Sequence, residues 1–165
     1  PGHHTQIAIA QDRDDLHRIT GIVFYSGFGE GWARYSEALA EEMGLYQTTT
    51  ALISRRAWPA RGMVVDPGLH LMGWSRDKAR RFMGESGRFS PEQLDQMVDR
   101  IAILPGQLTS YDSGALEIVA LRREAEKALG EDFDIREFHD RVLENGTVPL
   151  RLLRRHVEAW LERPQ

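Results

Sequence analysis

Residues 30–44, EGWARYSEALAEEMG, decide the fold class of this chain. The large apolar side chains of this segment lie close to the i, i+3, i+7, i+11 spacing of one helix face: Trp32, Tyr35, Leu39 and Met43. Gly44 follows them at the place where a helix C-terminus is expected. The segment therefore predicts an amphipathic helix that packs one face against a core.

The rest of the chain shows the same helical period. Residues 90–104 begin with Ser90 as N-cap, Pro91 at the first helical position and Gln93 completing a capping box. Asp134 and Glu137 repeat the box, and Gly146 follows that segment as a stop signal. No alternating pattern predicts a strand. We predict an all-α, multi-helix fold with helices at 17–28, 30–44, 47–72, 75–85, 90–104, 106–129, 134–145 and 148–162, kinked at Pro59 and Pro67.

Composition narrows the class of protein. The 165 residues suit one domain, and 41% hydrophobic with 28% charged residues is typical of a globular chain. No apolar run approaches the roughly 20 residues that span a bilayer, so we expect no membrane segment and leave the location, cytoplasmic or exported, open. A net charge of -4 argues against nucleic acid as a partner. Because there is no cysteine, a metal site here needs histidine and carboxylate ligands.

One face of the helix at 30–44 is acidic. At 100° per residue, Glu37 and Glu41 each fall within about 20° of Glu30, opposite the apolar stripe. One interpretation is a solvated acidic face. The other is that Glu30, on the first turn, points into a cleft as a metal ligand, in which case Glu30 should be much more buried than Glu41.

Two adjacent histidines, His3 and His4, precede the first apolar run of the chain. They lie 100° apart on a helix, so only one of them can share a face with a given group. A histidine on an early helix and a glutamate on a later one, as with His4 and Glu30, is the arrangement that completes a His, His, Glu site in helical zinc peptidases. If this holds, the histidine and Glu30 side chains should approach within about 5 Å.

Six motifs, in this order, resemble the C-terminal part of the bacterial family known as domain of unknown function 885: PGHHTQ, EGWARYSE, VVDPGLHLMGWSRDKA, PGQLTSYDSG, FDIREFHDRVLENGTVPL and a closing Trp. The resemblance implies an all-α metallopeptidase-like domain, similar in plan to the thimet-oligopeptidase and angiotensin-converting-enzyme group. The family signature is H-E-x-x-P-G-H-H-x-Q, of which this sequence supplies P-G-H-H-x-Q from Pro1 to Gln6. We therefore expect residues 1–165 to form the cleft-bearing C-terminal portion of one domain whose N-terminal portion is missing.

The resemblance also implies roles for individual residues. His3 or His4 would be a zinc ligand, with the choice between them open, and Glu30 would be the carboxylate ligand. Glu37 would orient a histidine from behind the metal. Tyr111 would donate to the oxyanion of a tetrahedral intermediate, and Gln107 would share its helix face as a second catalytic residue.

Three further residues follow from the same family pattern. Arg61, Asp66 and His70 would line the cleft, with Arg61 binding the carboxylate of a peptide substrate. The alternatives are that Arg61 and Asp66 form a structural ion pair, and that His70 caps a helix end. His139, which follows Phe138, is expected to be structural.

Three functions remain open at this point. The chain is part of a zinc peptidase, inactive alone for lack of the upstream H-E-x-x segment; or a helical scaffold or partner-binding relative without the metal; or part of a hydrolase of non-peptide amides. We expect the missing N-terminal half, a second chain supplying it, or a homo-oligomer to cover an apolar surface around Trp32, Tyr35 and Tyr111.

Overall fold

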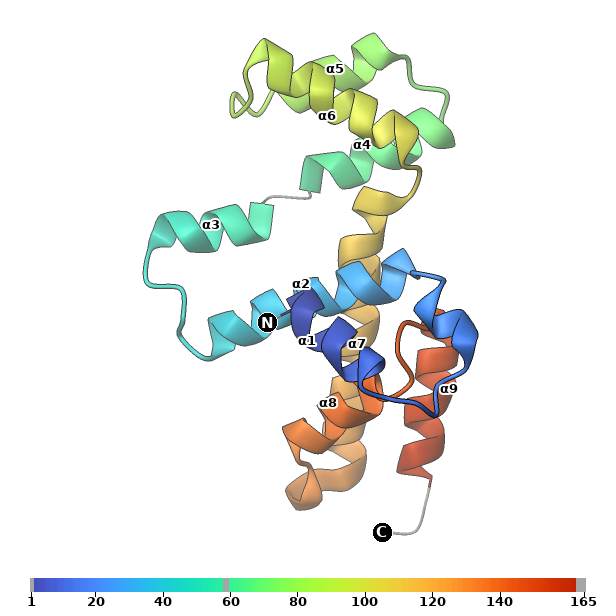
Figure 1. Ribbon diagram of the computed structural model, residues 1–165. Coiled ribbons are helices and arrows are strands. Elements are labelled where there is room, and N and C mark those ends of the chain that lie inside the picture. Colours follow the sequence, from blue (N-terminus) through green and yellow to red (C-terminus); the bar gives the residue numbers. More distant parts are fainter. Residues whose placement is uncertain (1, 58–59, 163–165) are drawn as a thin grey trace.

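The computed structural model describes residues 2–57 and 60–162, and Figure 1 shows their arrangement. Within that part the chain is helical and contains no strand, which confirms the all-α prediction. The elements, in chain order, are α1 (Gly2–Gln11), η1 (Arg18–Gly21), α2 (Ser26–Glu42), α3 (Thr49–Ala57), α4 (Ala60–His70), α5 (Arg76–Gly84), α6 (Pro91–Ile103), α7 (Gln107–Leu129), η2 (Gly130–Asp132), α8 (Ile135–Leu143) and α9 (Leu150–Leu161).

Helix ends with clear capping residues lie where the sequence predicts them. The Ser90 hydroxyl accepts a hydrogen bond from the Gln93 backbone N–H at 3.3 Å, and the Gln93 side chain accepts one from the Ser90 N–H at 2.9 Å. This capping box starts α6. Asp134 caps α8 differently from the prediction, because it accepts from the Arg136 N–H while Glu137 pairs with Arg141.

The prediction of a helix at 17–28 is wrong. The His17 ring accepts a hydrogen bond from the Ile19 N–H and starts only the short 3-10 turn η1. The backbone at Tyr25 is extended, and α2 then begins at Ser26 rather than at residue 30. The sequence reasoning missed this start because α2 carries glycines at its first turns, which lower helix propensity but allow close packing here.

The predicted helix at 47–72 is two helices, α3 and α4. Pro67 lies inside α4, while Pro59, the other predicted kink, lies outside the described residues. None of the α3 residues whose burial is described is buried, and Figure 1 shows α3 at the side of the molecule.

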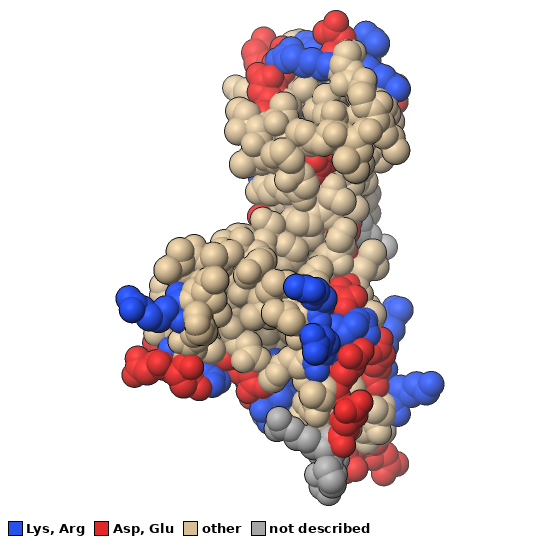
Figure 2. Space-filling view, turned by 90° about the vertical axis from the view of Figure 1, so that its right-hand side faces the viewer, with Lys and Arg blue, Asp and Glu red and all other residues tan. Residues whose placement is uncertain are grey.

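Two apolar cores lie at opposite ends of α7. The lower core joins α2, α7, α8 and α9 through residues such as Phe28, Tyr35 and Ile118. The upper core joins α4, α5, α6 and the start of α7, where Leu108 belongs to it. Figure 2 shows most of the charged side chains on one face gathered toward its two ends, with few between them. The single helix α7 therefore connects both cores.

Helices α2 and α7 cross at three glycines. A Cβ atom built on Gly114 would lie 1.8 Å from the Gly27 carbonyl oxygen and 2.7 Å from the Gly31 Cα. A Cβ on Gly31 would lie 2.5 Å from the Gly114 Cα. Since these neighbours are backbone atoms, no side-chain movement can make room. The crossing distance therefore requires glycine at these positions.

His139 lies against the lower core, as the sequence analysis expects of a structural residue. Its Nε2 atom is 2.9 Å from the Tyr35 hydroxyl, and its ring meets Trp32 edge-to-face. Burial, and then the positive charge of Arg122, lower the pKa of His139. The folded state therefore favours the neutral ring.

The glycine crossing yields a stability prediction. Gly114→Ala should lower the free energy of unfolding by about 2 kcal/mol, because overpacking costs about 1–3 kcal/mol even after the gain of up to about 1 kcal/mol in helix propensity. Ser113→Ala, at an exposed neighbouring position, is the matched control and should leave stability unchanged or slightly raised. Urea unfolding measures both variants, and an equal midpoint for Gly114→Ala and the parent chain would contradict the prediction.

The His139 site yields a pH prediction. Because the pKa is lowered in the folded state, the unfolded chain binds the proton more readily below its ordinary pKa of about 6.5. The free energy of unfolding should therefore fall as the pH drops from about 7 to about 5. In His139→Gln this fall should be smaller, whereas His4→Gln, which changes an exposed histidine, should retain it.

Candidate functional site

His3 and Glu30 meet where α1 lies against α2. The His3 Nε2 atom is 3.2 Å from Glu30 Oε2, within the separation expected of two groups that share a metal. The Glu30 side chain is only 10% exposed, although it belongs to the acidic face of α2. The Trp32 indole N–H donates to the Gly2 carbonyl at 3.1 Å and fixes the start of α1 beside this pair.

The other ring nitrogen of His3 faces Gln6, one turn further along α1. His3 Nδ1 is 3.4 Å from Gln6 Oε1, and the Gln6 side chain is fully buried. With the amide oxygen of Gln6 facing the ring, Nδ1 is the donor of this contact and Nε2 faces the Glu30 carboxylate, because an amide oxygen only accepts hydrogen bonds. A carboxylate and a ring nitrogen in this arrangement need a proton or a cation between them.

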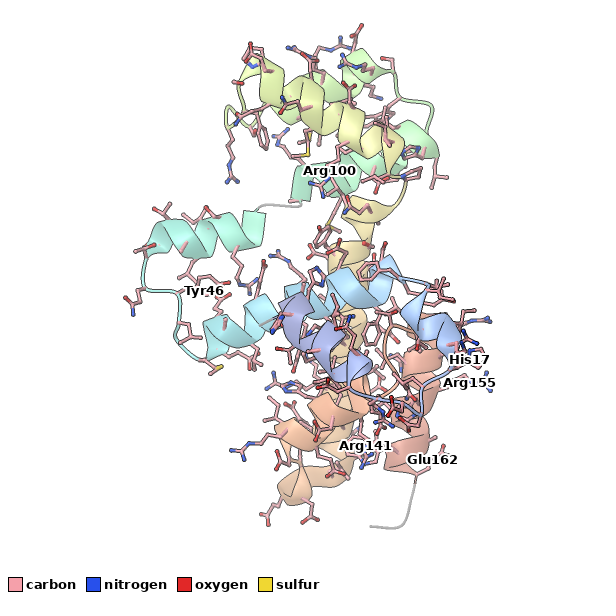
Figure 3. All side chains as sticks on the ribbon, in the orientation of Figure 1. His17, Tyr46, Arg100, Arg141, Arg155 and Glu162 are labelled. Carbon is pink, nitrogen blue, oxygen red and sulfur yellow. The ribbon has the colours of Figure 1, made fainter. Side chains whose placement is uncertain are left out.

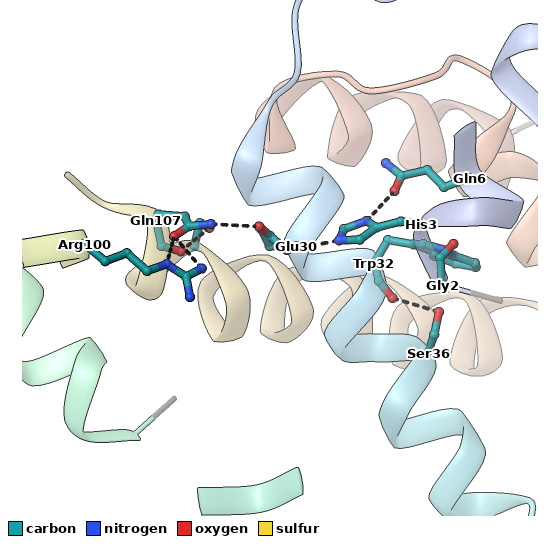
Figure 4. A network of polar contacts seen from close by, with 9 residues as sticks. Gly2, His3, Gln6, Glu30, Trp32, Ser36, Arg100 and Gln107 are labelled. Atoms are coloured by element: carbon teal, nitrogen blue, oxygen red, sulfur yellow. Dashed lines mark hydrogen bonds and ion pairs between the residues drawn. The ribbon is translucent and has the colours of Figure 1, made fainter. Parts of the chain in front are cut away.

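Gln107 supplies the second partner of Glu30. Its side-chain N–H group donates to Glu30 Oε1 at 3.3 Å, while its oxygen accepts from Arg100 Nε at 3.2 Å and Nη2 at 2.9 Å. Figure 4 shows the row of contacts from Gln6 through His3, Glu30 and Gln107 to Arg100. Each oxygen of Glu30 therefore has its own partner.

Tyr111 follows Gln107 by four residues in α7 and lines a cleft with His3 and Glu30. The cleft has a volume of about 470 Å³. Burial, and then the charge of Glu30, raise the pKa of Tyr111. Its hydroxyl therefore stays protonated near neutral pH and is able to donate a hydrogen bond.

The remaining acidic residues of α2 pair with arginines. Glu37 lines the cleft but accepts a hydrogen bond from Arg34 at 2.7 Å, so its partner is this arginine and not a histidine. Glu41 pairs with Arg55 of α3, and Arg34 also donates to the Arg55 carbonyl. The Glu41 side chain is 21% exposed against 10% for Glu30. Glu30 is thus the more buried, but by less than expected, because α3 covers Glu41.

His4 points elsewhere. It is exposed, and the 100° turn between neighbouring residues of α1 separates it from the face that carries His3. Of the two histidines between which the sequence leaves the choice open, His3 is the one that the structure brings to Glu30.

Asp66 and His70 make hydrogen bonds that join helices of the upper core. Asp66 is 2% exposed and accepts hydrogen bonds from the backbone N–H groups of Gly106 and Thr109, so it caps the start of α7. His70 Nε2 donates to the Ile101 carbonyl at 2.9 Å. Neither residue is among those that line the cleft, which does not support the substrate-binding role predicted for them.

Arg61 is held by contacts with the C-terminal end of α5, which also belongs to the upper core. It donates to the Phe82 carbonyl and to Glu85 at 3.1 Å, and its guanidinium stacks over the Phe82 ring. The alternative Arg61–Asp66 ion pair is not formed either, since Asp66 is committed to α7. Arg61 is also absent from the residues lining the cleft.

Comparison with known proteins agrees with this architecture. The model of the family described as "Bacterial protein of unknown function (DUF885)" matches residues 1–157. The chain belongs to this family.

Two solved structures of similar fold extend the DUF885 comparison. The putative lipoprotein from Colwellia psychrerythraea is 40% identical with a TM-score of 0.88, covering 98% of this chain and 28% of that protein. A putative lipoprotein of unknown function from Shewanella oneidensis is 26% identical with a TM-score of 0.79, covering 94% and 29%. No curated protein matches the chain. The chain thus spans less than a third of the length of these two relatives.

The separation of His3 and Glu30 in the DUF885 chain is compatible with two ligands of one metal ion. Two ligands of a tetrahedral zinc with bonds near 2.0–2.1 Å lie about 3.3 Å apart, so the His3 and Glu30 atoms at 3.2 Å fit two such positions. Among residues 2–57 and 60–162, no group of three or more histidines and acidic residues is placed to hold a metal. No helix in that part is long and apolar enough to cross a membrane.

Sequence reasoning missed the arginines of this site. Arg100 and Arg34 come from segments whose pattern predicts only solvated helix faces, and their partners lie 7 and 78 residues away in the chain. Helical periodicity gives the direction of a side chain on its own helix but not which helix it meets. No signal in the single sequence identified these contacts.

The environment of Tyr111 yields a titration prediction. Glu30→Gln should lower the pKa of Tyr111 relative to the parent chain, because it removes one of the charges that raise it. Ultraviolet absorbance of tyrosinate as a function of pH measures this, with Tyr111→Phe identifying the contribution of this tyrosine. Glu131→Gln, at an exposed position in η2, is the control and should leave the titration unchanged. An unchanged Tyr111 titration in Glu30→Gln would show that the two groups do not interact.

Proposed function

We propose that this chain is the C-terminal portion of a zinc-dependent peptidase domain that hydrolyses peptide bonds. The observation that carries the proposal is the His3–Glu30 pair at the cleft, in which Glu30 is buried and each partner makes a further hydrogen bond. The resemblance to metallopeptidases rests on the P-G-H-H-x-Q part of the signature. The third ligand and the general base belong to the H-E-x-x part of that signature, which would precede Pro1.

The polar contacts suit the demands of a zinc ligand set. A ligating histidine usually donates its other ring N–H to an oxygen, as His3 does to Gln6. Zinc, when bound, would polarise the scissile carbonyl and activate a water molecule. In this proposal Glu30 and His3 would hold the metal, and Gln6 and Gln107 would hold these two residues in place.

Tyr111 is proposed to bind the reacting substrate. It lines the same cleft as His3 and Glu30, and its hydroxyl stays protonated near neutral pH. A protonated hydroxyl beside the carbonyl would donate a hydrogen bond to the oxyanion that develops during hydrolysis. Gln107 is proposed to support Glu30 rather than to touch the substrate, since both ends of its amide have partners.

The scaffold alternative rests on the same contacts. A protonated His3 paired with Glu30, and Gln107 donating to the other oxygen, would satisfy the buried carboxylate without a metal. Metal binding distinguishes the two functions. Hydrolysis of a non-peptide amide would use the same residues, so only a panel of substrates separates it from peptidase activity.

We also propose that a further part of the protein covers exposed apolar side chains of this chain. Trp32 and Tyr35 are buried in the lower core, so the surface is not where the sequence analysis expected it. Exposed apolar side chains occur instead at Ile22, Leu71 and Ile103, each at least 75% exposed. The length of the two similar structures supports a covering segment of the same protein.

Export to the bacterial cell envelope is a proposal of the same kind. Its support is that both similar structures are putative lipoproteins. Within this chain no feature specifies the compartment.

The zinc proposal predicts a metal stoichiometry. The chain extended at its N-terminus by the H-E-x-x segment should bind about one zinc, measured by elemental analysis after gel filtration. His3→Ala and Glu30→Ala should lose most of the zinc, whereas His4→Ala should keep it because His4 faces away from Glu30. A zinc-free extended chain, or equal zinc in all variants, would favour the scaffold alternative.

Activity follows in the same extended chain. Tyr111→Phe should lower kcat for a peptide substrate by about 10²–10³-fold with KM nearly unchanged, since its hydrogen bond would form in the transition state. Assays on peptide libraries and on simple non-peptide amides measure this. Hydrolysis of the amides alone would replace the peptidase function by the amidase alternative.

The covering-segment proposal predicts association of the isolated chain. Sedimentation velocity should show oligomers that dissociate on Leu71→Lys and Ile103→Lys, because each change replaces an exposed apolar side chain with a charged one. Arg123→Glu is a surface control that should leave association unchanged. A monomeric parent chain at all concentrations would contradict the prediction.

A further inference from the structure

Arg100 reaches the candidate site from the helices that form the upper core. It belongs to α6, whose neighbouring residues Val98 and Ile101 are buried in the upper core. Figure 3 shows Arg100 where the helices of the upper core meet α7. Its guanidinium contacts the side-chain oxygen of Gln107 through both Nε and Nη2, at 3.2 and 2.9 Å. The arginine is therefore held by a packed helix and makes no direct hydrogen bond or ion pair with Glu30.

The chemistry of these groups fixes the direction of the Gln107 amide. A guanidinium has only donors, so the atom of Gln107 that faces it must be the oxygen. The amide nitrogen then points to the opposite side, where it donates to Glu30 Oε1 at 3.3 Å. If the amide were reversed, two donors would face each other and the Glu30 carboxylate would meet a second oxygen. Arg100 thus selects one of two orientations of the amide.

We propose that Arg100 is a positioning residue, which acts through Gln107 to hold Oε1 of Glu30 and leave Oε2 directed at His3. The part of this inference that concerns metal binding rests on the proposed function. The orientation of Gln107 and Glu30 does not. Nothing in the sequence pattern assigns a role to Arg100.

Two observations support this chain of contacts. Figure 4 shows the amide of Gln107 between Arg100 and Glu30, with dashed contacts on both sides. Arg100 and Glu30 also act in opposite directions on the pKa of Tyr111, which places both charges in one small cluster. The site therefore receives one of its constraints from the upper core, through the helix that carries Arg100.

The first experiment needs no metal. In the chain, the side-chain N–H₂ signals of Gln107, assigned by their loss in Gln107→Met, are followed by ¹H–¹⁵N correlation spectra. In Arg100→Met they should move toward the position of a solvated amide, because the amide is then free to turn. Arg100→Lys keeps one donor and should restore part of the parent shift. Arg76→Met, which removes another arginine held by carboxylates on α6, is the control and should leave these signals in place.

The second experiment uses the zinc-binding extended chain and a chelator competition assay. Arg100→Met should weaken zinc binding about tenfold, the effect expected for the loss of a group behind a ligand. In the Gln107→Met background, Arg100→Met should cause no further loss, because the link to Glu30 is already broken. This non-additivity separates action through Gln107 from a general loss of stability.

The outcomes decide between the two proposals. Unchanged Gln107 signals in Arg100→Met, or fully additive losses of zinc affinity, would overturn the positioning role. If the extended chain binds no zinc, the peptidase proposal falls while the metal-free spectra still test the positioning role. If Arg100→Met does not fold, Gln107→Met alone must weaken zinc binding as much as expected for Arg100→Met, and an undiminished affinity there would equally overturn it.

Discussion

The close crossing of α2 and α7 is the constraint on which the other features depend. Gly114 on α7 meets Gly27 and Gly31 on α2 so closely that no Cβ fits between the backbones. Glu30 is the neighbour of Gly31, so the same contact brings its carboxylate to the α7 face that carries Gln107 and Tyr111. A larger separation of the helices would open the cleft wall and remove the hydrogen bond that Gln107 gives to Glu30.

Burial of Glu30 is the second constraint, and it is electrostatic. An ionised carboxylate taken out of water needs partners that replace its hydration. Three elements supply them: α1 through His3, α7 through Gln107, and α6 indirectly through Arg100. The same requirement can be met by a proton on His3 or by a cation held between the two side chains. A buried acid that is stable either way is compatible with a site that gains and loses a metal.

The sequence could predict what depends on local chemistry. Capping residues such as Ser90 determine helix ends whatever the partner helix is, and the pairing of a histidine with Glu30 follows from helix period plus the family signature. It could not predict the start of α2, because glycines read as helix breakers are used for the α7 contact. Nor could it place Asp66, whose capped N–H groups lie 40 and 43 residues further along the chain.

Asp66 and Arg100 together show how the upper core reaches the candidate site. Asp66 on α4 accepts from the first N–H groups of α7 and so fixes where that helix begins. Gln107 is the first residue of α7, one position from the capped Gly106, and its side chain is held by Arg100 from α6. The backbone and the side chain of Gln107 are therefore both positioned by helices of the upper core. Because Gln107 donates a hydrogen bond to Glu30, a shift of α4 or α6 relative to α7 would change the geometry of that hydrogen bond. The helices of the upper core thus position the candidate site without lining the cleft. This explains why Asp66, which lies away from the cleft, is nevertheless buried and hydrogen-bonded to α7.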